Sequence, residues 1–96
     1  MSDIIYPDIA RDYERIAAKC AQAGDYDSAA ACWMQAANTW SLAADAEHDI
    51  SRRGELLRAK ASAFRAGGAA LDRAADAADA RAHACTRGVT SKGAVA

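Results

Sequence analysis

The sequence has little of what breaks a helix or crosses a membrane. Its one proline, Pro7, lies near the start, so long helical segments meet no internal breaker. No apolar run approaches the roughly eighteen residues of a membrane span, and no basic leader precedes a hydrophobic stretch. We therefore expect neither a membrane helix nor a secretory signal, and we expect the chain to stay in the cytoplasm.

Residues that carry chemistry are also few. The three cysteines, Cys20, Cys32 and Cys85, are odd in number and far apart, which favours reduced thiols over a disulfide framework or a zinc site. The two histidines, His48 and His83, belong to no metal-spaced or nucleophile–base motif. We therefore predict a protein without enzymatic activity, bound metal or cofactor.

Two local patterns suggest a ligand, and each has a simpler explanation. Asp79 and His83 are four residues apart and share one face of a predicted helix, which indicates an exposed ion pair more than a metal site. Gly24 is followed by Asp25, whose charge would repel a phosphate group. The turn at Gly24 is therefore not expected to bind phosphate.

Alanine is what the sequence has in abundance. It fills 28 of the 96 positions, whereas Ile, Leu, Val and Phe together fill twelve. Because alanine is the best helix former, we predict an all-α domain of three to four helices over residues 1–87, with a core of small side chains. Residues 88–96 are predicted to be a disordered, flexible tail. Such helices leave apolar surface to cover, so we expect a homo-oligomer, with a dimer favoured.

Turn and capping signals divide the chain into helices. Pro7 and Asp8 suit the first turn of a helix that ends at Gly24, and Asp25 suits the start of a second helix that extends to about residue 44. A polar segment at 45–49 precedes a third helix over 50–66. The glycines at 67 and 68 predict the end of that helix, and a fourth helix is expected over 69–87.

Apolar periodicity predicts which side of each helix is buried. The expected core positions are Ile9, Tyr13, Ile16, Ala17 and Cys20 in the first helix, and Tyr26, Ala29, Ala30, Trp33, Ala36, Ala37, Trp40 and Ala44 in the second. They are Ile50, Leu57, Ala61 and Phe64 in the third helix, and Leu71, Ala74, Ala75, Ala78, Ala82 and Cys85 in the fourth.

Charge is distributed unevenly between the two halves. Residues 1–50 carry three basic and nine acidic residues, a net charge of −6, and residues 51–96 carry nine basic and four acidic residues, a net charge of +5. On a helical projection, the basic residues of 50–66 flank the apolar stripe on both sides. This position favours pairing with acids of the first half or of another subunit. Contact with nucleic-acid phosphates is the alternative, although a DNA-reading helix would more naturally carry its basic residues opposite the buried face.

The residues around the first turn form a known pattern. It consists of Tyr13, Ile16, Ala17 and Cys20 before the turn and Gly24, Asp25, Tyr26, Ala29, Trp33 and Ala36 after it. This spacing resembles one tetratricopeptide helical hairpin. Ser41 stands where such a repeat usually closes on proline, and no second copy follows, so we do not expect a solenoid array.

The same hairpin, followed by a helix that contains Arg52 and Arg53, also resembles the small bacterial family of AraC negative regulators (ANR). This resemblance implies a small helical protein that binds a regulator of the AraC/XylS class and blocks its action.

We expect function on a surface beyond the hairpin turn. Trp33 is predicted to lie in the core, whereas Trp40 lies two turns later, beyond the expected reach of the first helix. Tryptophan is enriched among interface anchors, so Trp40 and Leu42 form the candidate contact surface, with a core position as the alternative for Trp40. The predicted partner-binding residues are Trp40, Leu42, Arg52, Arg53, Leu57 and Arg58.

The predicted function is stoichiometric inhibition, in which the chain masks the surface of a protein partner, most naturally a transcription regulator. One alternative is a regulator that binds nucleic acid through the basic second half. Another is a phage or plasmid counter-defence protein that inhibits a host complex by binding it.

Overall fold

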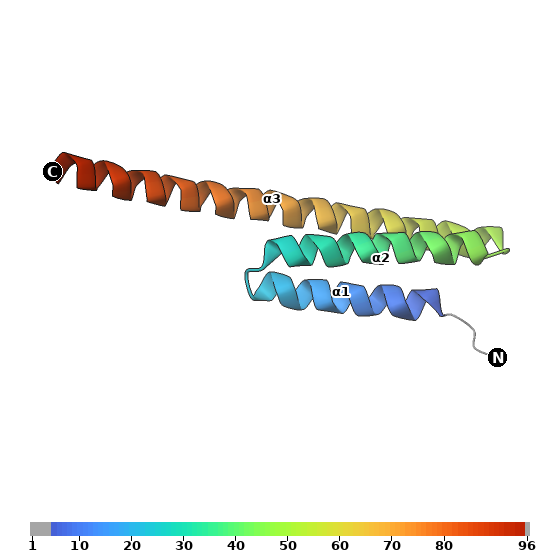
Figure 1. Cartoon of the computed structure of the whole chain (residues 1–96). Coiled ribbons are helices and arrows are strands. Elements are labelled where there is room, and N and C mark those ends of the chain that lie inside the picture. The colour runs from blue at the N-terminus through green and yellow to red at the C-terminus, as the bar shows by residue number, and fades with distance from the viewer. Residues whose placement is uncertain (1–4, 96) are drawn as a thin grey trace.

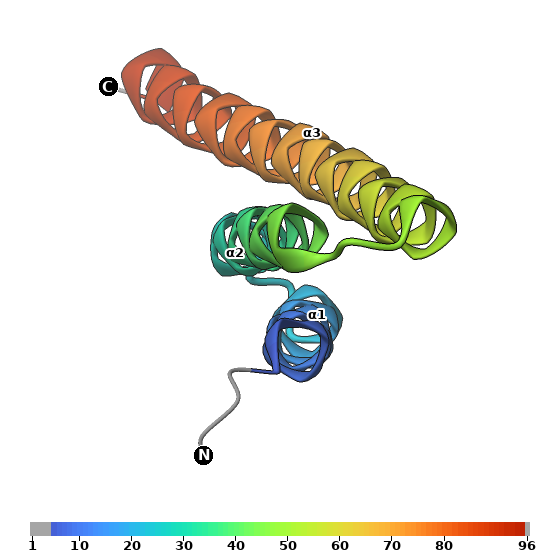
Figure 2. The same ribbon diagram turned by 90° about the vertical axis from the view of Figure 1, so that its right-hand side faces the viewer.

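A computed structural model describes the backbone of residues 5–95 and the side chains of residues 5–85. The fold is all-α, as the composition predicts, with α1 at Tyr6–Gln22, α2 at Tyr26–Ala46 and α3 at Ile50–Val95. α1 and α2 form an antiparallel hairpin, and α2 lies between α1 and the much longer α3 (Figure 1, Figure 2). The flexible tail predicted for 88–96 falls where side chains are not described, and it stays a prediction.

The turn between α1 and α2 is built from local backbone and capping bonds. Gly24 has a φ of +81°, a left-handed conformation that favours glycine. Its N–H donates to the Ala21 carbonyl at 3.0 Å, and the Asp25 N–H donates to the Cys20 carbonyl at 2.9 Å, which together form a Schellman motif. The Asp25 carboxylate then accepts the Ser28 N–H at 3.2 Å and caps α2. The predicted end of α1 and start of α2 are confirmed.

The core lies mainly along α2, and its side chains are small. Of the eight core positions predicted for α2, six are buried and two, Tyr26 and Trp33, are half-buried. The fully buried alanines let α2 approach α1 and α3 closely, while aromatic rings from α1 and α2 fill the remaining space. The buried stripe predicted for α2 is thus confirmed. It also includes Thr39 and Ala43, which sequence periodicity did not select.

The predicted helix break at Gly67 and Gly68 is wrong, because α3 is continuous through both residues (Figure 1). Gly67 is buried where α3 crosses α2. A Cβ at this position would lie 3.3 Å from both the Trp33 Cβ and the Met34 Sδ. Glycine therefore serves close helix packing here, and the packing against α2 offsets its low helix propensity.

The buried faces predicted for α1 and for the two segments of α3 also need correction. In α1, Ala10 and Ala17 are buried, whereas Ile9 and Ile16 are largely exposed. In α3, the positions that pack on α2 are Leu56, Ala59, Ala63, Gly67 and Ala70, and Ala74 and Ala77 further along are half-buried. Of the positions predicted to be buried, Ala74 is half-buried, and the others are exposed: Ile50, Leu57, Ala61, Phe64, Leu71, Ala75, Ala78, Ala82 and Cys85. Small residues occupy the contact faces because they allow the backbones to approach, and the larger aliphatic side chains remain outside.

The molecule is elongated because α3 extends well past the α1–α2 hairpin. Its principal extents are 70 × 24 × 16 Å. Residues 78–85 of α3 are exposed, and the C-terminal half of the helix projects away from the rest of the chain (Figure 1). Within the described residues, no helix combines the length and apolar character needed to cross a membrane.

Candidate protein-binding surfaces

Trp40 is a core residue, which corrects its predicted place at a contact surface. It is 5% exposed, and its Nε1–H donates to the Glu14 carboxylate of α1 at 3.0 Å. The Arg11 guanidinium lies over its ring, 5.7 Å from the centroid. α1 reaches Trp40 because it extends back from the turn to Tyr6, so the antiparallel hairpin covers about sixteen residues on each side of Gly24.

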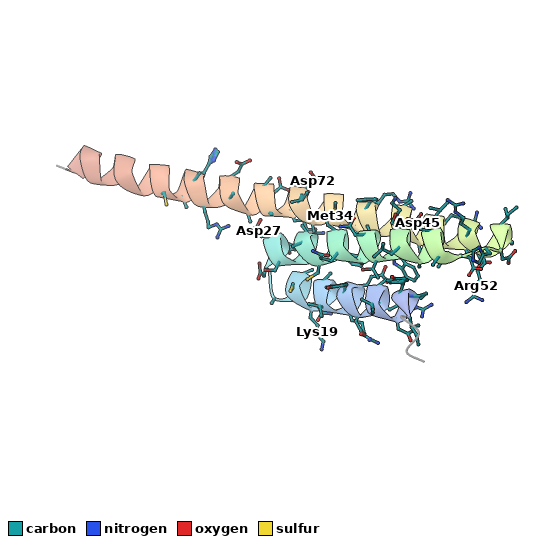
Figure 3. All side chains as sticks on the ribbon, turned by 45° about the vertical axis from the view of Figure 1, so that its right-hand side comes forward. Lys19, Asp27, Met34, Asp45, Arg52 and Asp72 are labelled. Carbon is teal, nitrogen blue, oxygen red and sulfur yellow. The ribbon has the colours of Figure 1, made fainter. Side chains whose placement is uncertain are left out.

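The other predicted partner-binding residues do not form one surface. Leu42 is 50% exposed on α2, and Arg52, Arg53, Leu57 and Arg58 are exposed on α3. At 100° per residue, Arg52 and Leu57 point in directions about 140° apart. Arg52 lies at the end of the molecule where α2 leads into α3 (Figure 3). Leu57 and Arg58 lie on the outer side of α3, away from the face that packs on α2.

Arg52 belongs to a hollow at this end, which we call the turn-end hollow. It has a volume of about 250 Å³. It is lined by Ile5, Tyr6, Pro7, Ala43, Ala46, Glu47, Arg52 and Leu56. The start of α1, the end of α2 and the start of α3 therefore all contribute to it.

The turn-end hollow is lined by apolar side chains and by one ion pair. Arg52 Nε lies 3.4 Å from the Glu47 carboxylate, and the Arg52 side chain is 68% exposed. Glu47 also accepts the backbone N–H of Asp49 at 3.1 Å, which fixes the short turn between α2 and α3. Sequence reasoning found Arg52 but missed Leu56, because the apolar stripe of α3 was assigned to Leu57, one residue away. It missed Tyr6 because the first helix was expected to begin at Pro7.

A second surface runs along the outside of α3. Ile50, Leu57, Phe64 and Leu71 are spaced seven residues apart, and we call them the outer stripe. Their exposed fractions are 87, 43, 39 and 54%. Four exposed large apolar side chains at one helical spacing form a continuous band, which is uncommon on a surface that meets only water.

The basic residues of the second half meet few acids of the first half. Among the described side chains, Arg52–Glu47 is the only ion pair between the halves, and the other two ion pairs, Arg11–Asp8 and Arg15–Asp12, lie within α1. Lys60 instead donates to the Ser41 hydroxyl at 3.2 Å, and Arg73 lies over the Tyr26 ring. Pairing inside the chain is therefore limited to this contact among the described side chains, and the predicted alternative of pairing with another subunit stays a prediction.

The remaining chemical groups form no cluster that would suggest a reaction or a metal site among the described residues. The three cysteines are free, as predicted, and burial together with the nearby Cys20 raises the pKa of the Cys32 thiol. His83 Nδ1 lies 3.2 Å from the backbone oxygen of Asp79, so the predicted contact with the Asp79 carboxylate is wrong. Within the part of the chain described, no three His, Cys, Asp or Glu side chains are grouped as a metal site would need.

No protein-family model, curated protein or solved structure matches this chain. The class that the fold defines is an all-α chain in which a short helical hairpin packs on one long helix.

Proposed function

We propose that this chain is a non-enzymatic modulator that binds another protein through the turn-end hollow and masks part of its surface. The observation that carries the proposal is the composition of the hollow. The hollow is lined by apolar groups that include Tyr6 and Leu56, together with the Arg52–Glu47 pair, of which Arg52 is exposed. Protein interfaces combine an apolar centre with a polar rim, and arginine is enriched in them.

The size of the hollow supports a protein ligand. A volume of about 250 Å³ accommodates one or two apolar side chains of a partner, which is less than most small-molecule sites need. Ile5, 55% exposed at the edge of the hollow, extends the apolar area. Arg52 can exchange Glu47 for a carboxylate of the partner at little cost, because the Arg52 side chain is 68% exposed.

The nature of the partner is proposed from the sequence. The resemblance of the hairpin to the AraC negative regulators supports a partner that is a transcription regulator of the AraC/XylS class. We propose that the two proteins meet in the cytoplasm. Binding of this kind acts by occupancy, so the degree of inhibition should follow the molar ratio of the two proteins.

The proposal is tested by capture with matched variants. The tagged chain should retain one protein from the native host in a fixed molar ratio, identified by mass. Ile5→Ser combined with Arg52→Glu should lower the affinity for that protein by tenfold or more, since both changes fall in the hollow. The control is Ile16→Ser with Arg15→Glu, which makes the same chemical changes at exposed positions of α1 outside the hollow. Equal loss in both double variants would contradict the proposal.

Nucleic-acid binding remains the competing function, and the exposed arginines of α3 favour it. It predicts tight binding to random duplex DNA that falls steeply as salt is raised, because each phosphate contact releases counterions. We expect weak binding with a shallow salt dependence. A steep slope, reduced by Arg53→Gln and Arg58→Gln, would establish the competing function instead.

A further inference from the structure

The outer stripe of α3 is accompanied by a row of small residues. Each member of the outer stripe is followed four positions later by Gly54, Ala61, Gly68 or Ala75, which we call the small row. Positions four apart on a helix lie on the same side. Together the two rows form the seven-residue repeat of a helix that packs on another helix, with a large residue at one core position and a small one at the other.

This face is open within the chain. A Cβ placed on Gly54 or Gly68 would meet no atom within 4 Å in the described part of the molecule. By contrast, a Cβ on Gly67 would press on α2. α2 contacts α3 on a neighbouring face that includes Ala63 and Ala70, so the outer stripe contributes little to the fold of the single chain.

The charged residues beside the outer stripe change sign along α3. Arg58 and Arg65 each follow a member of the stripe, and Asp72 and Asp79 occupy the equivalent positions further along. All four side chains are exposed, and none makes an ion pair with another described side chain of its own chain. One flank of α3 is therefore basic in its first part and acidic in its second part.

We propose that the outer side of α3 binds a second copy of this chain in an antiparallel pair, with the two-fold axis passing near residues 68 and 69. In this register Arg65 faces the partner subunit's Asp72, and Arg58 faces the partner subunit's Asp79. Two-fold symmetry repeats each contact in reverse, so this flank contains four ion pairs of opposite charge. On the other flank the same register brings Lys60, which is bonded to Ser41, toward the partner subunit's Arg81. This interface is separate from the turn-end hollow.

The apolar residues fit the same register. Leu71 packs against the partner subunit's Gly68, and Phe64 packs against the partner subunit's Ala75. These two large side chains near the axis thereby meet the small row of the other copy, which fills space without leaving a cavity. Agreement between the charge register and the packing register is what selects this arrangement.

A parallel pair is disfavoured on both grounds. Parallel helices would bring Lys60 beside the partner subunit's Arg65, and Arg53 beside the partner subunit's Arg58, which places like charges together. Glycine at position 68 would face the partner subunit's Gly68, and Phe64 would face the partner subunit's Phe64. The contact between the two glycines would leave a void, and the contact between the two phenylalanines would be crowded.

Charge reversal tests the register. Sedimentation equilibrium at low ionic strength should show a dimer for the wild-type chain, because exposed ion pairs are screened by salt. Arg65→Asp or Asp72→Arg alone should weaken self-association about tenfold, since each change places like charges together at two symmetric sites. The double variant, Arg65→Asp with Asp72→Arg, should restore dimerisation because it exchanges the two partners.

Matched controls and one packing variant complete the test. Arg15→Asp and Asp45→Arg make the same charge changes on α1 and α2 and should leave the dimer intact. Gly68→Gln should keep the helical circular dichroism of the folded chain, because its Cβ meets open space, and should abolish the dimer. A monomeric wild-type chain, or a double variant as weak as the single ones, would overturn the proposal. A dimer that Arg65→Asp strengthens would show the parallel arrangement and overturn it as well.

Discussion

At the scale of single residues, Gly67 and Gly68 are neighbours with opposite surroundings. Gly68→Ala should raise the free energy of unfolding by up to about 1 kcal/mol, because it removes a glycine from a helix and adds a methyl group in open space. Gly67→Ala should gain less or lose stability, since its methyl would lie 3.3 Å from the Trp33 Cβ, which cannot move without shifting α2.

Urea unfolding at concentrations where the chain is monomeric measures this difference. Gly67→Val is the sharper variant, because its extra methyl groups cannot be placed without separating α2 and α3. It should cost about 1–3 kcal/mol. Equal effects at the two glycines would mean that α3 does not approach α2 at Gly67.

The stability of the fold should depend on pH through the carboxyl group of Asp25. Its hydrogen bonds with Ser28 hold the pKa of the carboxyl below its ordinary value of 3.8. A lowered pKa in the folded state stabilises the chain at pH values above the unfolded pKa, and this contribution is lost as the pH falls through the folded pKa. Asp25→Ala should therefore lower Tm at neutral pH, and the difference from wild type should shrink below about pH 4.

Asp25→Asn is the matched control, because asparagine also caps helices but does not titrate. Its Tm difference from Asp25→Ala should stay nearly constant across the same pH range. If the difference between wild type and Asp25→Ala were equally constant, the carboxylate would not be the group that caps α2.

At the scale of helices, local signals were predictive and long-range packing was not. Gly24 and Asp25 set the α1–α2 turn through bonds to residues within five positions, so the sequence pattern was sufficient. The face of α3 that packs on α2 could not be predicted in the same way. The large apolar residues of the outer stripe and the mostly small residues that pack on α2 both recur at helical spacing, and periodicity alone does not tell which set meets α2.

The wrong assignment of the buried face of α3 also limited the prediction of the candidate sites. Leu57 was assigned to the core, so Leu56, which lines the turn-end hollow, was missed. Trp40 was assigned to the surface because the reach of α1 was underestimated. Arg52 and Arg58 were found as exposed basic residues, but their separate surfaces follow from the position of α2, which no residue spacing in α3 reveals.

At the scale of the whole molecule, the two surfaces are compatible. The turn-end hollow lies at the start of α3, and the proposed two-fold axis lies near residues 68 and 69. At 1.5 Å per residue, an antiparallel pair would place its two hollows roughly 50 Å apart, at opposite ends. Each dimer would then hold two partner molecules, and self-association would not compete with partner binding.

The projecting part of α3 gives the last prediction. A chain that ends after residue 80 keeps Ala70, which packs on α2, and the half-buried Ala74 and Ala77, and it loses side chains that are exposed up to residue 85. At concentrations where it is monomeric, we expect its Tm to lie within about 3 °C of the full chain, because little buried apolar surface is removed.

A chain that ends after residue 69 is the control, since it also loses Ala70, which is 6% exposed and packs with Ala29 and Ala30. Its Tm should fall by more than about 5 °C, since α2 then exposes both alanines to water. Thermal circular dichroism separates the outcomes. The chain that ends after residue 80 should lose helical signal only in proportion to the residues removed and should keep one cooperative transition. A large drop in Tm for the chain that ends after residue 80 would mean that the distal part of α3 stabilises the single chain, and that its exposed face is not free for a second copy.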